Sequence, residues 1–123
     1  MLITLPLPPV DKKGRSILSP NTRSHYMAKA KAVKEYRSEA HASALVIIDG
    51  GYPPLYETAM VLFRWYHRTA HRIDPDNIIA TMKSAIDGLN DAGVFDDDNK
   101  ITYLPPEQFT DKDNPRIEIK VYG

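Results

Sequence analysis

The sequence predicts an α+β domain in which two main helices pack on a mixed β-sheet. Four short stretches with the alternation or β-branched content of strands occur at residues 2–5, 57–69, 101–104 and 116–122. Two longer stretches, 23–48 and 76–92, have apolar residues at helical spacing. These elements give the order β-α-β-α-β-β along a single domain that spans residues 1–123.

The first expected strand ends at Leu5, because the prolines that follow have no backbone N–H to donate to a sheet. Residues 11–21 are then expected to form a flexible loop. This loop contains Lys12, Lys13 and Arg15. Such a loop can close on the phosphates of DNA, although most basic loops are simply solvated.

The first helix is expected over residues 23–48, ended by Gly50-Gly51. Lysines are spread over most of its surface. Its apolar face is predicted to consist of Met27, Ala30, Val33, Ala40, Ala44 and Ile47.

The strand at residues 57–69 is expected to present one set of alternating residues to the core, namely Ala59, Val61, Phe63 and Trp65. His67, Arg68, His71 and Arg72 follow, directly before an acidic motif. We interpret these side chains as exposed basic residues that flank DNA, in preference to histidine ligands of a metal.

The second helix has recognisable ends. Asp74 suits the N-cap position, Pro75 the first helical position and Gly93 a left-handed C-terminal cap. An apolar stripe on one side is predicted to face the core. The stripe comprises Ile78, Ile79, Met82, Ala85, Ile86 and Leu89.

Acidic residues gather at both ends of this helix, at Asp74/Asp76 and at Asp96/Asp97/Asp98. In an uninterrupted helix, Lys83 and Asp87 project within roughly 20° of Asp76. This combination predicts a divalent-metal site for phosphodiester cleavage. Hard carboxylate ligands favour Mg²⁺, or Mn²⁺, over zinc, and the absence of cysteine excludes disulfides and thiolate metal sites.

Each acidic feature also has a purely structural interpretation. Asp-Pro-Asp-Asn is a good helix start, three aspartates in a row commonly form a solvated turn, and Lys83 can simply neutralise Asp87. Periodicity does not decide whether the triplet returns to Asp74, which is a question of tertiary structure.

The formal net charge is zero, but the charges are unevenly distributed along the chain. Residues 1–72 have a net charge of +6, and residues 73–123 have −6. A nuclease needs cations for phosphates and carboxylates for a metal, although the two sets can also interleave after folding. No apolar run has the length of a membrane span, so we expect a soluble, cytoplasmic protein without a membrane partner.

The central motif consists of Asp74-x-Asp76-Asn77, Lys83, Asp87-x-Leu89, Ala92-Gly93 and Asp97-Asp98, preceded far upstream by Leu5-Pro6-Leu7-Pro8-Pro9. This pattern touches most of the chain and resembles the RusA-type Holliday junction resolvases (crossover junction endodeoxyribonucleases) of bacteria and their prophages. There are two departures from the family pattern. Lys83 lies about one helical turn farther from Asp76, and Asp96 adds a third acidic residue to the later pair.

The resemblance implies a homodimeric, metal-dependent endonuclease that resolves four-way DNA junctions in recombination and repair. It implies catalytic roles for Asp74, Asp76, Lys83 and Asp98, and metal ligation by Asp74, Asp76, Asp97 and Asp98. Contacts to branched DNA are expected from Lys12, Lys13, Arg15, Arg23, Lys29, Arg68 and Arg72. Alternatives are a flap or other branched-DNA nuclease, an inactive junction-binding module, and a metal-dependent hydrolase of nucleotides.

Overall fold

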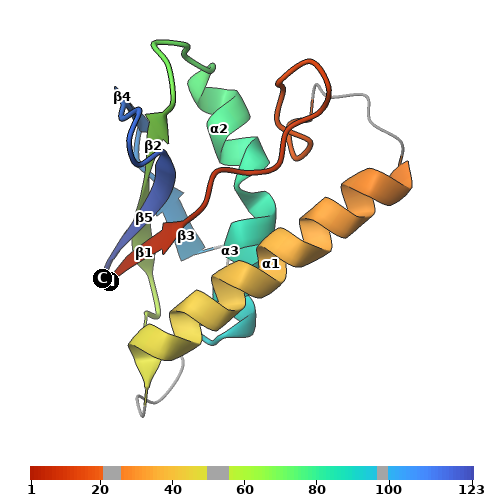
Figure 1. Ribbon diagram of the computed structural model, residues 1–123. Helices are drawn as coiled ribbons and strands as arrows, with labels where there is room; N and C mark the ends of the chain where they lie inside the picture. The colour runs from red at the N-terminus through yellow and green to blue at the C-terminus, as the bar shows by residue number, and fades with distance from the viewer. Residues whose placement is uncertain (21–25, 50–55, 97–99) are drawn as a thin grey trace.

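The computed structural model describes residues 1–20, 26–49, 56–96 and 100–123, and it confirms the α+β class (Figure 1). Its elements are close to the predicted order, with one expected helix divided in two and one additional strand. In chain order they are β1 (Leu2–Leu5), α1 (Tyr26–Ile48), β2 (Ala59–His67), α2 (Pro75–Thr81), α3 (Lys83–Asp91), β3 (Ile101–Tyr103), β4 (Glu107–Thr110) and β5 (Arg116–Tyr122).

Strand β2 lies at the centre of the mixed sheet. On one side it pairs antiparallel with β5, which in turn pairs antiparallel with β1. On the other side it pairs in parallel with two short strands: Ala59 faces Ile101 of β3, and His67 faces Thr110 of β4. Strand β4 therefore lies beside the end of β2 from which the chain leaves for α2.

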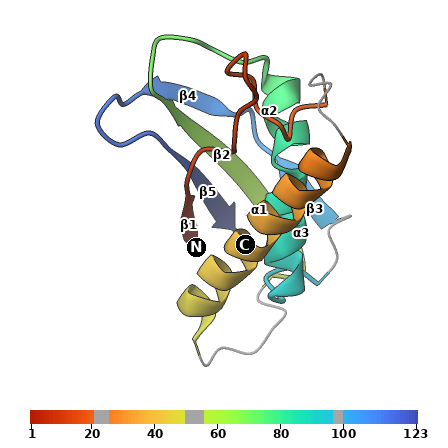
Figure 2. The same ribbon diagram turned by 45° about the vertical axis from the view of Figure 1, so that its right-hand side comes forward.

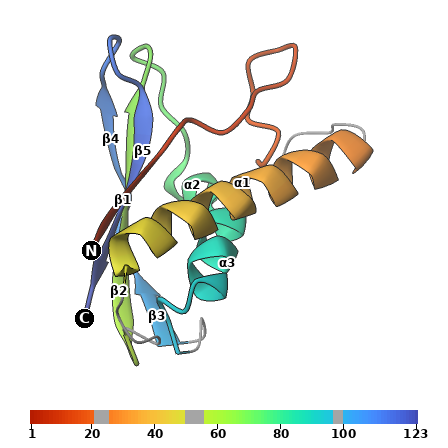
Figure 3. The same ribbon diagram turned by 60° about the horizontal axis from the view of Figure 1, so that its bottom comes forward.

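The three described helices lie on one side of the sheet (Figures 1 and 3). The predicted alternation of β2 is confirmed, since Ala59, Val61, Phe63 and Trp65 are all buried. In α2 and α3 the predicted stripe is also buried, except for Ile79, which is half-buried. None of the helices in the described ranges is both long and apolar enough to cross a membrane.

Helix α1 packs beside α3 (Figure 2) through a face that differs from the predicted one. Of the predicted set, Met27, Ala30 and Ile47 are exposed, Val33 is half-buried, and only Ala40 and Ala44 are buried. The buried stripe consists of residues spaced four apart, namely Ala32, Tyr36, Ala40 and Ala44.

The physical reason is the close approach of the two helices. A Cβ atom built on Gly88 of α3 would clash with the carbonyl oxygen of Arg37 and lie 2.9 Å from the Cβ of Ala40. Small side chains are therefore required along this contact. At its edge, Asp91 accepts two hydrogen bonds from the guanidinium of Arg37, at 2.6 and 2.8 Å.

The helix expected over residues 76–92 is interrupted at Met82, whose φ and ψ are −85° and 3°. Methionine is a good helix former, so the residue types gave no sign of this break. The cap at the far end is as predicted: Gly93 has φ +83°, and Val94 N–H donates to the Leu89 carbonyl at 3.1 Å. The break means that one continuous helix does not set the angle between Asp76 and Lys83.

Candidate nucleic-acid and metal site

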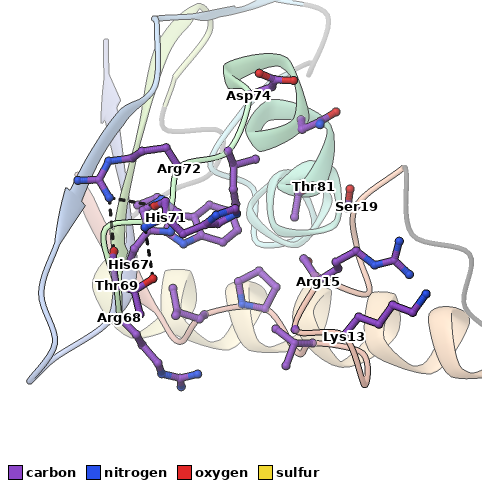
Figure 4. Close-up of a pocket in the computed structure, with 18 residues that line it drawn as sticks. Lys13, Arg15, Ser19, His67, Arg68, Thr69, His71, Arg72, Asp74 and Thr81 are labelled. Carbon is purple, nitrogen blue, oxygen red and sulfur yellow. Dashed lines mark hydrogen bonds between the residues drawn. The ribbon is translucent and has the colours of Figure 1, made fainter.

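A cleft of about 670 Å³ opens where two loops meet, one following β1 and the other linking β2 to α2 (Figure 4). Figure 4 shows Lys13 and Arg15 of the first loop across the cleft from Arg68 and Arg72 of the second. Asp74 stands where the second loop enters α2. The cleft therefore brings basic residues of both loops to one of the predicted catalytic carboxylates.

The first loop, predicted to be flexible, contains a hydrogen-bonded turn. Val10 and Ser16 form an isolated β-bridge. Between them, the Asp11 carboxylate accepts the backbone N–H groups of Lys13 and Arg15, each at 2.9 Å. Asp11 also pairs with the Arg15 guanidinium at 3.1 Å. These contacts fix the direction in which the turn presents its cations.

The second loop is held by the side chain of Gln108 on β4. Its Nε2 donates to the Ile73 carbonyl at 2.8 Å, and its Oε1 accepts the Ile73 N–H at 2.9 Å. The His67 ring, predicted to be exposed, is buried and bonds to the same Oε1 at 2.8 Å. Because an amide oxygen only accepts, His67 Nε2 carries the proton. Burial lowers the pKa of His67, which keeps the ring neutral at neutral pH.

Arg72 stabilises the same loop. Its guanidinium donates to the His71 carbonyl at 2.9 Å and to the Thr69 carbonyl at 3.5 Å (Figure 4). It also donates to Thr110 Oγ1 at 3.1 Å. A guanidinium has five N–H donors, so contacts to a ligand remain open to it. Arg72 therefore has a structural role that its position in the sequence did not indicate.

Asp74 occupies the predicted N-cap position of α2, with Pro75 after it. Its backbone carbonyl accepts the N–H groups of Asn77 and Ile78 at 2.9 and 3.1 Å. Its carboxylate makes no capping hydrogen bond. A helix start explains the residue type at this position but leaves the carboxylate oxygens available as ligands. Asn77 and Thr81, three and seven residues later, line the cleft on the same side of α2.

Asp76 lies in the first turn of α2 and is exposed, but it does not line the cleft. Lys83 begins α3 and donates to Asp87 at 2.9 Å, as the structural interpretation of this lysine predicted. Asp76 and Lys83 are therefore both at the surface. They lie on two helices, α2 and α3, which are separated at Met82.

The later acidic group is only partly described, since Asp97 and Asp98 lie outside the described residues. Asp96 is exposed and pairs with Lys100 at 3.3 Å. Its backbone N–H donates to the carbonyl of Tyr56, at the approach to β2. Within residues 1–20, 26–49, 56–96 and 100–123, no three His, Asp or Glu side chains gather closely enough to hold a metal ion.

Asp74 and Asp96, the described members of the two acidic groups, are attached near opposite ends of β2. Ile101, just after the acidic triplet, pairs with Ala59 at the start of the strand. Ile73, just before Asp74, is bound to Gln108, which pairs with Trp65. Ala59 and Trp65 are separated by roughly 20 Å at the usual rise of a strand. Participation of Asp98 in a site with Asp74 therefore stays a prediction.

The predicted DNA-binding residues fall into three groups. Lys13, Arg15, Arg68 and Arg72 line the cleft. Two others are neighbours of residues that line the cleft: Lys12 is exposed in the same turn as Lys13, and Lys29 Nζ of α1 donates to the carbonyl of the cleft residue Ser19 at 3.3 Å. Arg23 lies outside the described residues.

Gln108 and Asn77 were not predicted to belong to the site. Asn77 was visible in the Asp-x-Asp-Asn motif, where it could have been assigned a ligand-facing role. Gln108 gave no signal, because its position depends on the pairing of β4 with β2.

The family model for the endodeoxyribonuclease RusA matches residues 6–122, which is nearly the whole chain. No curated protein has significant similarity to the chain. The match includes both loops of the cleft, the whole of α2 and α3, and all three acidic positions that follow them. The chain therefore belongs to the RusA family of endodeoxyribonucleases, Holliday junction resolvases that use divalent metals.

Proposed function

We propose that this resolvase uses Mg²⁺, with Mn²⁺ as a substitute, and that Asp74, Asp76 and Asp98 are its principal ligands, assisted by Asp97. The observation that carries the proposal is the position of Asp74 at a cleft lined by basic side chains. A carboxylate that makes no capping hydrogen bond can hold a metal, while the cations beside it bind a phosphate.

The donor chemistry fits a hard divalent cation. The chain has no cysteine, and His67 is buried and bonded to Gln108, so the acidic residues at the start of α2 offer carboxylate oxygens as ligands. When bound, such an ion activates water and stabilises charge that develops on the scissile phosphate. Lys13, Arg15 and Arg68 would orient the phosphodiester backbone at the rim of the cleft.

We assign to Lys83 the stabilisation of negative charge on the phosphate or on the leaving oxygen. An ammonium group acts as a point cation in this role. The ion pair with Asp87 is compatible with it, because a surface pair at this spacing is worth only a few tenths of a kcal/mol.

A homodimer is the assembly that suits the substrate. A four-way junction needs two matched incisions, and two copies related by a two-fold axis supply two equivalent sites. Mixing wild-type chains with an inactive variant should then yield junctions nicked in one strand only. A DNA substrate also agrees with the expected cytoplasmic location.

The test is cleavage of a labelled four-way junction beside a linear duplex made of the same arms, with Mg²⁺, with Mn²⁺ and with chelator. Symmetric nicks in the junction alone, dependent on metal, are the expected result. Junction binding without products in either metal would instead assign a binding module. Turnover of mononucleotides without competition by long DNA would assign a nucleotide hydrolase.

A further inference from the structure

The cleft has an apolar interior beneath its cationic rim. Pro8, Trp65 and Ile73 line the interior and are buried or half-buried. Val10 lines it as well, with 52% of its surface exposed, although valine is ordinarily buried. A volume of about 670 Å³ lies within the range of pockets that enclose small organic ligands. The interior can therefore cover an apolar group of a ligand. A phosphate backbone alone has no such group.

Aromatic rings continue into this interior from the end of β2. The His67 ring stacks on Trp65, with centroids 5.4 Å apart and planes at 20°. His71 meets His67 edge to face at 6.3 Å and is exposed. Figure 4 shows His67 and His71 close together between the two basic loops. An exposed ring in this position can stack on a planar ligand.

The cleft thus combines an apolar interior that has an exposed ring with a cationic rim. A nucleotide fits both, because it has a flat base and a charged phosphate. Lys13 and Arg68, on opposite sides of the cleft, have side chains for which the structure gives no ion pair within the described ranges. In a paired duplex the bases are stacked inside, so a base can reach the interior only when it is unpaired. Extruding a paired base costs a few kcal/mol, and the pairs at the centre of a four-way junction are those that end an arm.

We propose that the cleft binds one unpaired nucleotide from the centre of the junction, with its base against Val10 and His71 and its phosphate at the rim beside Asp74. This inference rests on the proposed function. It adds a binding step that places the adjacent phosphate at the carboxylates. Stacking on aromatic side chains is worth about 1–3 kcal/mol per base, which offsets part of the cost of unpairing.

The experiment places 2-aminopurine at successive positions around the centre of a junction and measures its fluorescence on binding, in chelator so that no cleavage takes place. We expect a rise of several-fold at one symmetry-related position and none within the arms. Permanganate should also react more strongly with a thymine at that position. His71→Ala and Val10→Asp should each reduce both signals at least two-fold.

His41→Ala is the matched control, because His41 lies on α1 and does not line the cleft. It should behave as the wild type. If the junction is bound and cut while no position responds, the cleft does not take a base, and the proposed function stands. If the signals are unchanged in both His71→Ala and Val10→Asp, the base lies elsewhere. If the junction is neither bound nor cut, the proposed function itself is wrong.

Discussion

The side chain of Gln108 pairs with the backbone of Ile73 as a neighbouring strand would. Its amide donates to the Ile73 carbonyl at 2.8 Å and accepts the Ile73 N–H at 2.9 Å. Because Ile73 directly precedes Asp74, this pair fixes the point from which the carboxylate projects. Gln108 does not itself line the cleft, so we assign it the role of a positioning residue.

Replacing Gln108 by alanine leaves two half-buried backbone groups without partners. We expect the free energy of unfolding in urea to fall by about 1–3 kcal/mol. The Mg²⁺ concentration for half-maximal cleavage should rise, while junction affinity in chelator changes little. Thr102→Ala, at an exposed position of β3, is the control. An unchanged metal requirement in a folded Gln108→Ala protein would show that Asp74 does not depend on this contact.

His67 makes the stability of the protein sensitive to mild acid. Burial lowers its pKa from the ordinary 6.5, and the hydrogen bond with Gln108 opposes the shift. The folded protein therefore binds fewer protons at this ring than the unfolded chain does, so stability rises with pH between the two pKa values. The contribution is present above pH 6.5 and is lost as the pH falls below it.

The His67→Gln variant tests this sensitivity, because it keeps an N–H donor and cannot take up a proton. Between about pH 7.5 and about pH 5.5 we expect the wild type to lose more unfolding free energy than the variant. Urea denaturation at the two pH values measures both losses. Equal losses would assign the acid sensitivity to other groups.

The contact between α1 and α3 predicts opposite effects for two alanine substitutions in α3. Gly88→Ala should reduce the free energy of unfolding by about 1–3 kcal/mol through overpacking, since the backbone of Arg37 blocks the new methyl group. Ser84 Oγ is buried with no hydrogen-bond partner in the described part of the chain. Ser84→Ala should therefore be neutral, or stabilising by up to about 1 kcal/mol.

Urea unfolding of the two variants checks both signs. Alanine is ordinarily more stable than glycine inside a helix by about 1 kcal/mol. A Gly88→Ala protein more stable than the wild type would therefore mean that the helices do not approach as closely as Arg37 and Ala40 indicate.

The sequence predicted the elements in which one face is buried and the other is not. The alternation in β5 and the apolar stripe through Ile78 and Leu89 record that difference, so their inward faces were predicted correctly. The same reasoning failed for α1, where large apolar residues such as Met27 are exposed and alanines form the contact. Which face of α1 is buried depends on Gly88 of α3. The spacing of residues within α1 carries no information about that neighbour.

The site was predictable to the extent that it depends on residue type. Asp74 and the basic residues of both loops were identified from their chemistry, and the fold brings four of those basic residues to the cleft. Gln108 was missed because β4 is short, mixed in character and recognisable only through its pairing with β2. The relation between Asp76 and Lys83 was expected from a continuous helix, which the break at Met82 does not provide.

The basic turn should contribute to DNA affinity through its charge. Neutralising Lys12, Lys13 and Arg15 together should reduce the slope of log affinity against log salt by about 0.9 for each phosphate that the turn no longer neutralises. Junction binding at several salt concentrations gives the slope. Lys120→Gln is a control, since Lys120 alternates with buried residues of β5 and points away from the core. An unchanged slope in the triple variant would remove this turn from the DNA surface.

The carboxylates provide the sharpest test of the metal site. Asp74→Asn, Asp76→Asn and Asp98→Asn should each reduce cleavage more than about 100-fold, a larger effect than removal of a group that only supports a metal ligand. Junction binding should persist in all three. Asp96→Asn is the matched control, because Asp96 pairs with Lys100 and its backbone is bonded near the start of β2.

These outcomes also decide how far the site extends. Full activity in Asp76→Asn would rule out a metal site at the start of α2. If Asp74 and Asp76 prove essential while Asp98→Asn retains full activity, the ligands are confined to that helix start. If Asp98 is equally essential, its carboxylate must join Asp74, although Ile101, three residues after Asp98, is attached roughly 20 Å along β2 from the point that holds Ile73. Asp98 would then reach Asp74 either within the same chain or from the second copy in the dimer. Mixed dimers of Asp74→Asn and Asp98→Asn chains distinguish the two: a site shared between copies regains one intact set of ligands, whereas a site within one chain regains none.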